Sequence, residues 1–456
     1  MKSSTISPVL WRSVLMLSLP VALQMLMQSM LGMADVLMVG HLGTAAVAAV
    51  GLSAKIHFLM LVLMSGLATG ASVLIAQHAG AKDTLNCQKI FSVTMLVSSI
   101  TILPFFISFA FLSPIWVNWI NPDKEVVQLA VTYLVITAPV LLLTQWIVIY
   151  EASLRALGHT AMPLVAGIFA AIANIAMNYA LINGHWGFPA LGVAGAAWGT
   201  LIARCLQTLF IVAWVYWSKQ LFALGIAQWK NAKDKLQIRR YIQFSTPLVA
   251  NYVIWGVGNS VYHLMTGFSG TQALAVMGVI VPVESSFFAL FVGFANASAI
   301  LIGRELGAGN MQAAWNLRLF FEKLTYSLLA IFCVTLWFLR PWVVGLFDQL
   351  DAESKHLLMQ TLGFFCVFVV LKVSNLIRIV GVLRAGGDNK FTLITDTTVM
   401  WGFGIPIFIF SIFFLNLSFI YLYLLMFLED ALKFFPVLKR VISRKWMNNL
   451  TVRDVG

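Results

Sequence analysis

Four polar residues inside apolar stretches have side chains that could carry out chemistry: Asp35, Asn174, Asn178 and Thr200. An aspartate at the centre of a membrane helix costs about 2.5–3.5 kcal/mol on insertion scales, so its presence there needs a reason. Burial disfavours the charged form of a carboxyl group, whereas neutral neighbours supply hydrogen bonds without a fixed cation. A carboxyl in such surroundings is suited to binding and releasing a proton. We therefore predict that Asp35 is a proton carrier.

The expected helix ends place these four side chains at similar depths. Asp35 lies near the outer end of the first helix, and Asn178 lies six residues before Gly184, where the fifth helix ends on the same side. Asn174 is one turn deeper than Asn178 and on the same face, because residues four apart share a helix face. Thr200, in the returning sixth helix, falls level with Asn174. We expect the four side chains to converge in the outer half of the first lobe.

Other interpretations stay open for these residues. Asp35 could be a helix-end residue whose carboxylate reaches the outer surface. The asparagines could be interhelical hydrogen-bonding residues, worth about 0.6 kcal/mol each. Sodium could replace the proton, but it prefers a tighter cage of oxygen ligands with more charge, and the sequence offers one acid here. We therefore favour a proton over sodium, and no metal centre or cofactor is indicated.

Four further residues are candidates for coupling or for lining a cleft. Pro20 removes a backbone hydrogen bond from the first helix, which predicts a hinge, although a role at the helix entry is an alternative. Gln24 and Gln28 face the same way at i and i+4 and are candidates for lining the cleft. Glu284 is interpreted as the one intramembrane acid of the second half and as a candidate second acid.

The composition identifies the elements that must hold these residues. Hydrophobic residues make up 60% of the 456 residues and charged residues 10%, with a mean hydropathy of +0.90, which excludes a soluble domain. Apolar runs of about 20 residues separated by polar breaks predict membrane-spanning helices, twelve in all. The first run, from about Trp11, lacks a small-residue cleavage site and is interpreted as a retained span. The four cysteines show no metal-binding or disulfide spacing.

The net charge of +12 is a topological signal. Most Lys and Arg fall in the loops that would face inward if the chain starts inside, whereas the outward loops hold Lys124, Arg340 and Lys355. This bias follows the positive-inside rule and predicts that both termini are cytoplasmic. The basic residues therefore imply contact with membrane lipids and no nucleic-acid site.

The two halves of the chain repeat each other when the sequence is aligned with itself so that Pro20 meets Pro247. A later pair, Leu154-Arg155-Ala156 and Leu383-Arg384-Ala385, recurs at nearly the same shift. We predict an N-lobe over residues 1–217, a cytoplasmic linker over 218–240 and a C-lobe with tail over 241–456. Each lobe has six helices, so the two halves enter the membrane from the same side and form a parallel repeat.

The first half carries a series of short motifs, in chain order Pro20, Asp35, Val39-Gly40, Gly80-Ala81-Lys82, Leu154 to Gly158, Asn174, Asn178 and Pro189 to Ala197. Together these motifs resemble those of the multidrug and toxic compound extrusion (MATE) transporters. Each motif is weak alone, but their order and spacing cover essentially the whole chain. The resemblance implies a twelve-helix, two-lobe exporter in a bacterial inner membrane that exchanges amphipathic, often cationic, drug-like compounds for protons or sodium. We further expect that the protein is a monomer.

Departures from the family pattern indicate a branch. NorM-like members carry functional carboxylates near the positions of Trp255 and Asn375, where this chain has neither acid, and Tyr262 stands at the repeat position of Asp35. What remains resembles the DinF-like branch, in which the first-helix aspartate is the central acid. We therefore predict a proton-coupled antiporter that exports such compounds by alternating access.

Two alternatives lie outside drug export. A flippase for lipid-linked precursors would need several cations gathered in the cleft for a pyrophosphate, and the sequence scatters them. A membrane-embedded enzyme would need a nucleophile with a base, paired acids or metal ligands at matching depth, and no such set is found. We therefore expect that the protein is not an enzyme.

Overall fold

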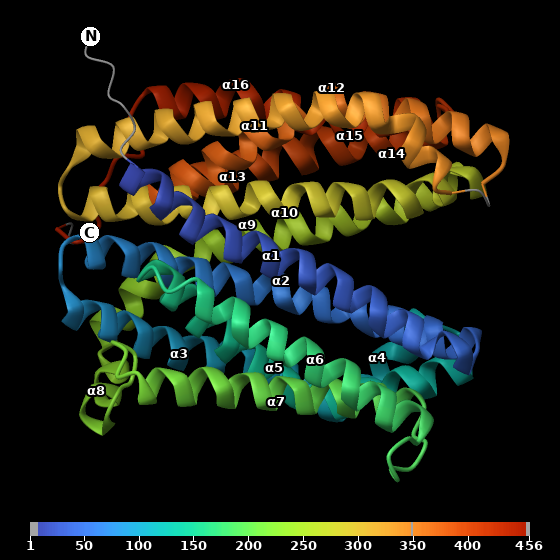
Figure 1. The fold of residues 1–456 in the computed structure, drawn as a ribbon, viewed down its shortest axis with the longest axis horizontal. Coiled ribbons are helices and arrows are strands. Elements are labelled where there is room, and N and C mark those ends of the chain that lie inside the picture. Colours follow the sequence, from blue (N-terminus) through green and yellow to red (C-terminus); the bar gives the residue numbers. More distant parts are fainter. Residues whose placement is uncertain (1–7, 348–349, 453–456) are drawn as a thin grey trace. The chain divides into compact units, whose positions relative to one another are not determined.

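The computed structural model describes residues 8–347 and 350–452, and these residues form helices and no strand. Ten helical segments among them are long and apolar enough to cross a membrane. The more polar α9 and the pair α15 and α16 complete a set of twelve (Figure 1). The bounds are α1 Pro8–Val39, α2 Thr44–Gly80, α3 Thr84–Ile107 with α4 Ser113–Ile120, α5 Lys124–Ala156, α6 Ala161–Asn183, α7 Val193–Trp217, the short α8 Ile226–Lys230, α9 Lys235–Thr266, α10 Thr271–Gly307, α11 Met311–Gly345, α12 Ala352–Leu376, α13 Asn389–Val399 with α14 Ile405–Phe413, and α15 Phe419–Met426 with α16 Leu428–Ile442. The predicted all-α, twelve-helix membrane fold is confirmed.

Glycines and aspartates set the helix ends. Gly43 and Gly270, which the repeat makes equivalent, precede α2 and α10 with φ of 111° and 99°, a conformation that L side chains rarely adopt. Asp83 caps α3 by accepting from the Asn86 backbone N–H at 3.1 Å, and Asp123 caps α5 in the same way. Gly43 and Gly270 thus begin α2 and α10 at equivalent positions of the two halves.

The chain forms two compact units. The N-unit consists of Leu23–Ala79 and Asp83–Val249, and the C-unit consists of the residues up to Ala22, Gly80–Lys82 and the residues from Ala250 onward. Two helices are divided: α1 changes unit after Ala22, and α9 changes unit after Val249. The two crossing points are equivalent in the repeat, and each lies two residues beyond a proline inside the helix, Pro20 or Pro247. The predicted lobe and linker boundaries, at 217 and 240, stay a prediction.

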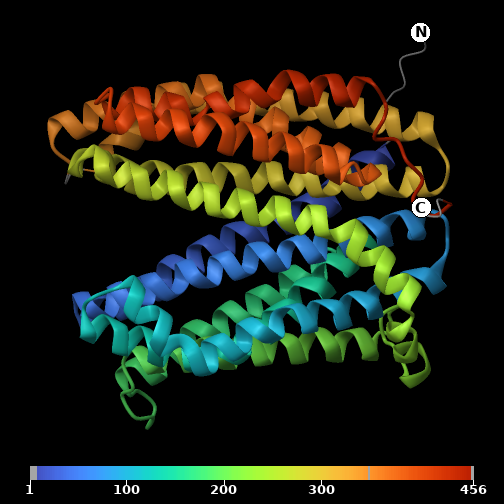
Figure 2. The same ribbon diagram turned by 180° about the vertical axis from the view of Figure 1, so that it is seen from behind.

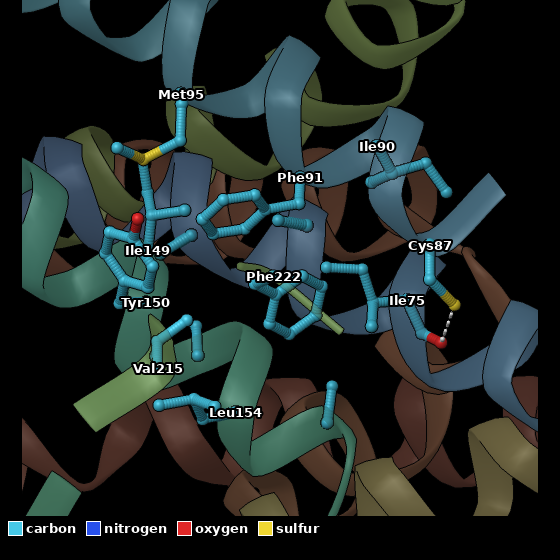
Figure 3. Packing of buried hydrophobic residues seen from close by; sticks show 14 of the residues in the cluster. Ile75, Cys87, Ile90, Phe91, Met95, Ile149, Tyr150, Leu154, Val215 and Phe222 are labelled. Atoms are coloured by element: carbon cyan, nitrogen blue, oxygen red, sulfur yellow. Dashed lines mark hydrogen bonds between the residues drawn. The ribbon is translucent and has the colours of Figure 1, made fainter. Parts of the chain in front are cut away.

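An aromatic and aliphatic cluster holds α2, α3, α5 and α7 of the N-unit together (Figure 3). Phe91 lies at its centre, with its ring centroid 4.6 Å from that of Phe222 and 4.9 Å from that of Tyr150. The Cys87 thiol donates to the Ile75 carbonyl at 3.7 Å, as the dashed line in Figure 3 shows. The last turns of α5 are therefore fixed on their neighbours, including the stretch around Leu154.

Helices α6 and α7 lie side by side and approach closely (Figures 1 and 2). A Cβ atom at Gly195 would collide with the Leu181 carbonyl, and one at Gly199 would collide with the Asn178 side chain. Glycine at these two positions is therefore what lets the helices touch. The loop over residues 184–192 joins them at one end of the N-unit, and α8 lies at the opposite end (Figure 1).

Candidate functional site

The four residues singled out in the sequence come together in the N-unit. The Asn178 Nδ2 atom donates to Asp35 Oδ1 at 2.7 Å and to Asn174 Oδ1 at 3.2 Å. Asn174 Nδ2 in turn donates to Thr200 Oγ1 at 3.4 Å. One chain of hydrogen bonds thus joins α1, α6 and α7.

Asn178 is the centre of this chain. Its side chain is fully buried, and its Oδ1 atom has no hydrogen-bond partner among the described residues. Asn174 and Asn178 share a face of α6 because they are four residues apart. The position of the Asn178 amide against Asp35 therefore depends on the flat surface that Gly199 presents on α7.

We predict that Gly199→Ala slows transport by about a hundredfold, because a displacement of about 1 Å at a reacting group has a cost of that size. The added methyl group would collide with Asn178 and move its amide away from Asp35. The measurement is the initial rate of ethidium uptake into inverted vesicles at equal protein amount. Gly51→Ala is the matched control, since a Cβ atom there meets nothing within 4 Å. Equal rates for the two variants would contradict the prediction.

A small cavity of about 60 Å³ opens beside this chain of hydrogen bonds. The lining residues are Met27, Gln28, Leu31, Asp35, Gly167, Ala170, Ala171, Asn174, Thr200, Ala203, Arg204 and Gln207. A space of this size with polar walls is large enough for water. The predicted lining residue Gln28 is part of the wall, whereas Gln24 lies buried outside it.

The prediction that Asp35 has only neutral partners is wrong. Arg204 on α7 carries a positive charge, lines the same cavity and interacts electrostatically with Asp35. A further neutral residue, Tyr133 on α5, forms a hydrogen bond with Thr200. The sequence holds a signal for Arg204, because Thr200, Arg204 and Gln207 stand at i, i+4 and i+7 on one helix face. That face turns toward α1, which only the packing of the helices reveals.

A second buried acid, Glu151, was absent from the sequence interpretation. Its Oε2 atom accepts from Gln24 Nε2 at 2.9 Å and from Arg155 at 3.4 Å, and its Oε1 atom accepts from Gln207 at 3.4 Å. Gln207 also accepts from the Arg204 guanidinium at 2.8 Å. Glu151 therefore belongs to the same polar system as the cavity, and Gln24 serves as its partner.

In the C-unit, Glu284 has its own partners. The Tyr423 hydroxyl donates to Glu284 Oε1 at 2.5 Å, and Lys372 Nζ lies 4.0 Å from Oε2. The interpretation of Glu284 as the one intramembrane acid of this half is wrong, since Asp396 and Glu429 are also buried in the helices. A role of Glu284 as a second acid stays a prediction.

The buried acids of the C-unit surround a lysine. Lys433 Nζ lies 3.0 Å from Asp396 Oδ1 and 2.5 Å from Glu429 Oε1, and all three side chains are less than one tenth exposed. Asn251 Nδ2 donates to Asp396 Oδ2 at 2.7 Å. Tyr262, the repeat counterpart of Asp35, interacts electrostatically with Glu429. The sequence contains one clue, the i and i+4 spacing of Glu429 and Lys433.

Comparison with known families supports a relationship over most of the chain. The MatE family profile matches residues 20–180 and 247–410. The uncharacterized transporter YisQ of Bacillus subtilis is 25% identical over 405 residues, which cover 87% of this chain and 86% of YisQ. The probable multidrug resistance protein NorM of Thermotoga maritima is 25% identical over 414 residues, which cover 88% of this chain and 85% of that protein.

Solved structures share the fold. A multidrug resistance MATE family transporter of the MOP superfamily, in an outward-facing conformation, superposes with a TM-score of 0.83 at 19% identity, over 95% of this chain and 96% of that one. A MOP superfamily transporter from Pyrococcus furiosus superposes with a TM-score of 0.84 at 18% identity, over 95% of this chain and 96% of the other. At these identities the likeness concerns the fold.

Proposed function

The chain belongs to the MatE family, and from this premise we propose that it is a proton-coupled antiporter that exports small amphipathic, often cationic, compounds. The observation that carries the proposal is the hydrogen bond between Asn178 and Asp35, on the wall of a cavity large enough for water in a multi-pass membrane protein. The names of related multidrug resistance proteins support the substrate class. The DinF-like branch stays a prediction.

The charges around Asp35 favour a proton over sodium. A sodium ion in this cavity would lie near the fixed positive charge of Arg204. It would also need several oxygen ligands, whereas Asp35 Oδ1 and Asn174 Oδ1 already accept hydrogen bonds from Asn178. A proton needs one carboxylate oxygen and no cage. Asp35 in this setting therefore supports proton coupling, with a sodium-coupled exporter as the alternative.

The export cycle requires that protonation of Asp35 changes the shape of the protein. Pro20 interrupts the hydrogen-bond ladder of α1 two residues before this helix changes unit. Protonation alters what Asp35 can accept from Asn178, and α1 transmits the change along its axis. In this proposal Pro20 is the hinge of α1, and the two units alternate access to the cavity.

The experiment that tests the function uses purified protein in liposomes with an internal pH indicator and an acidic interior. Addition of ethidium outside is expected to release protons from the interior, and a sodium indicator is expected to show no movement. Protein-free liposomes are the control for leakage. Sodium release without proton release would replace this proposal with the sodium-coupled alternative, and movement of neither ion would remove ion coupling altogether.

The same proposal places the protein in a bacterial inner membrane, as a monomer with both termini in the cytoplasm. The basic residues at the ends of α7, α9 and α16 support this orientation, since they gather on loops of one predicted side. A flippase for lipid-linked precursors has less support, because Arg204 is the one cation among the described residues that lines the cavity beside Asp35.

A further inference from the structure

The two halves repeat one contact that the proposed export mechanism does not use. Gln24 meets Asn251 in the alignment that sets Pro20 on Pro247, and Arg155 meets Arg384 in the repeated Leu-Arg-Ala motif, so both pairs are equivalent in the repeat. Arg155 donates to Gln24 Oε1 at 3.4 Å, and Arg384 donates to Asn251 Oδ1 at 2.7 Å. In each unit, therefore, an arginine donates to the side-chain amide oxygen of a residue on the first helix of that half.

The amide nitrogen of each pair then donates to a buried carboxylate. Gln24 Nε2 donates to Glu151 at 2.9 Å, and Asn251 Nδ2 donates to Asp396 at 2.7 Å. The two acids stand on different helices, α5 and α13, so the repeat preserves the contact and not the position of the acid. A buried acid at this place in both units is an arrangement that packing alone does not require.

The two acids differ in their cations. Asp396 lies 3.0 Å from Lys433 in a close buried ion pair, and the lysine is shared with Glu429. The charged groups that face Glu151 are two arginines: Arg155, at 3.4 Å on its own helix, and Arg204 from α7. The remaining groups that face Glu151, from α1 and α7, are the neutral amides of Gln24 and Gln207. Glu151 is therefore held by weaker contacts than Asp396.

The charges of the N-unit site balance in a way that suits exchange. Two acids, Asp35 and Glu151, and two arginines, Arg155 and Arg204, sum to zero when both acids are ionised. A proton on either acid leaves a net charge of +1, which disfavours a cationic substrate nearby. One proton shared between the two acids is therefore enough to exclude the substrate.

Gln207 lies between the cavity and the second acid, because it lines the cavity and contacts Glu151. The cavity extends from Asp35 to Arg204 and Gln207, and Gln207 Nε2 reaches Glu151 Oε1 at 3.4 Å. Gln24, which contacts Glu151, precedes Asp35 by eleven residues of α1, so the acids are separated by about 16 Å along the helix at about 1.5 Å per residue. Glu151 lies five residues before the end of α5, at Ala156, which is the end predicted to face the cytoplasm.

We propose that Glu151 is a second proton site that receives the proton from Asp35 and releases it on the cytoplasmic side. This inference rests on the proposed proton-coupled function. The O–H bond on Asp35 breaks, the proton passes to water in the cavity, and it moves past Gln207 to the Glu151 carboxylate, where a new O–H bond forms. That bond then breaks toward cytoplasmic water, and both acids return to the ionised form while Arg155 and Arg204 stay charged.

The test compares Glu151→Gln, Glu151→Asp and Asp35→Asn in liposomes with an internal pH indicator and ethidium as the substrate probe. We expect Glu151→Gln to slow ethidium-driven proton release by about a hundredfold, the low end of what a positioned proton-transfer group contributes. Glutamine, like the protonated acid, leaves the site with a net charge of +1, so ethidium binding by the detergent-solubilised variant should weaken. Glu151→Asp should recover part of the release, with a shifted dependence on internal pH. Glu125→Gln is the control, since Glu125 is an exposed acid of the same helix.

The outcomes separate the two proposals. Loss of proton release in both Asp35→Asn and Glu151→Gln supports the second site. Loss in Asp35→Asn with full release in Glu151→Gln overturns the second site and leaves the proposed function standing, whereas full release in both removes the proposed function. If Glu151→Gln does not fold, Glu151→Asp decides: an unchanged pH profile overturns the second site, because a merely structural carboxylate would leave that profile unmoved.

Discussion

Asp35→Asn is expected to reduce proton-coupled export to the level of protein-free vesicles. Asparagine keeps the shape of the side chain, and its Oδ1 atom can still accept the hydrogen bond that Asn178 donates to Asp35 at 2.7 Å. What the substitution removes is the group that binds a proton. Because the amide resembles the protonated acid, α1 should stay in the conformation that follows protonation at every pH.

The measurement is ethidium uptake into inverted vesicles energised by a pH gradient. Glu353→Gln is the control, since Glu353 is an acid that makes an exposed hydrogen bond to Gln272. Expression level and monodispersity in detergent should match the unchanged protein, which shows that the loss concerns coupling. An Asp35→Asn protein that exports at the unchanged rate would exclude Asp35 as the carrier.

The part of the site that the sequence predicts is the part that local geometry determines. Asp35, Asn174, Asn178 and Thr200 were placed together from helix ends and from the spacing of four residues along a helix, and the structure joins them by hydrogen bonds. These rules describe depth and face within each helix. They succeed here because the turns, such as the one at Gly184, end the helices where the sequence indicates.

The missed residues depend on which helix faces become neighbours. Arg204 and Glu151 carry ordinary helical spacing, and only the packing of α1, α5 and α7 brings them to Gln24 and Gln207. Glu151 lies one turn before Arg155 in α5, and no spacing pattern in the sequence distinguishes it from the other residues of that helix. The repeat contains a signal for this buried contact, since Gln24 and Asn251 are polar residues at equivalent positions. Equivalent polar residues in both halves of a duplicated membrane protein therefore point to buried contacts.

The cluster around Lys433 was missed for a related reason. Asp396 on α13 and Lys433 on α16 are separated by a turn and by α14 and α15, so no local period links them. NorM-like members carry acids near the positions of Trp255 and Asn375, whereas the acids of this unit stand at other positions. Because these charged groups are buried, removal of one partner leaves the others without compensation, which leads to the last prediction.

Lys433→Met is expected to destabilise the C-unit by about 3–5 kcal/mol, the cost of removing one partner from a buried ion pair. The substitution leaves Asp396 and Glu429 charged, close together and less than one tenth exposed. Methionine fills a similar volume, so the loss concerns charge and not packing. The destabilisation should be larger at high pH and smaller at low pH, because the two carboxyl groups can take up protons as the pH falls and no longer need the lysine.

Thermal loss of monodisperse protein in detergent, measured across pH, gives the readout for this variant. Lys439→Met, at an exposed lysine of the same helix, is the matched control. Glu429→Gln added to Lys433→Met should recover part of the stability, because it removes one of the two uncompensated buried charges. If the Lys433→Met and Lys439→Met proteins have the same melting temperature at all pH values, the cluster around Lys433 does not stabilise the fold.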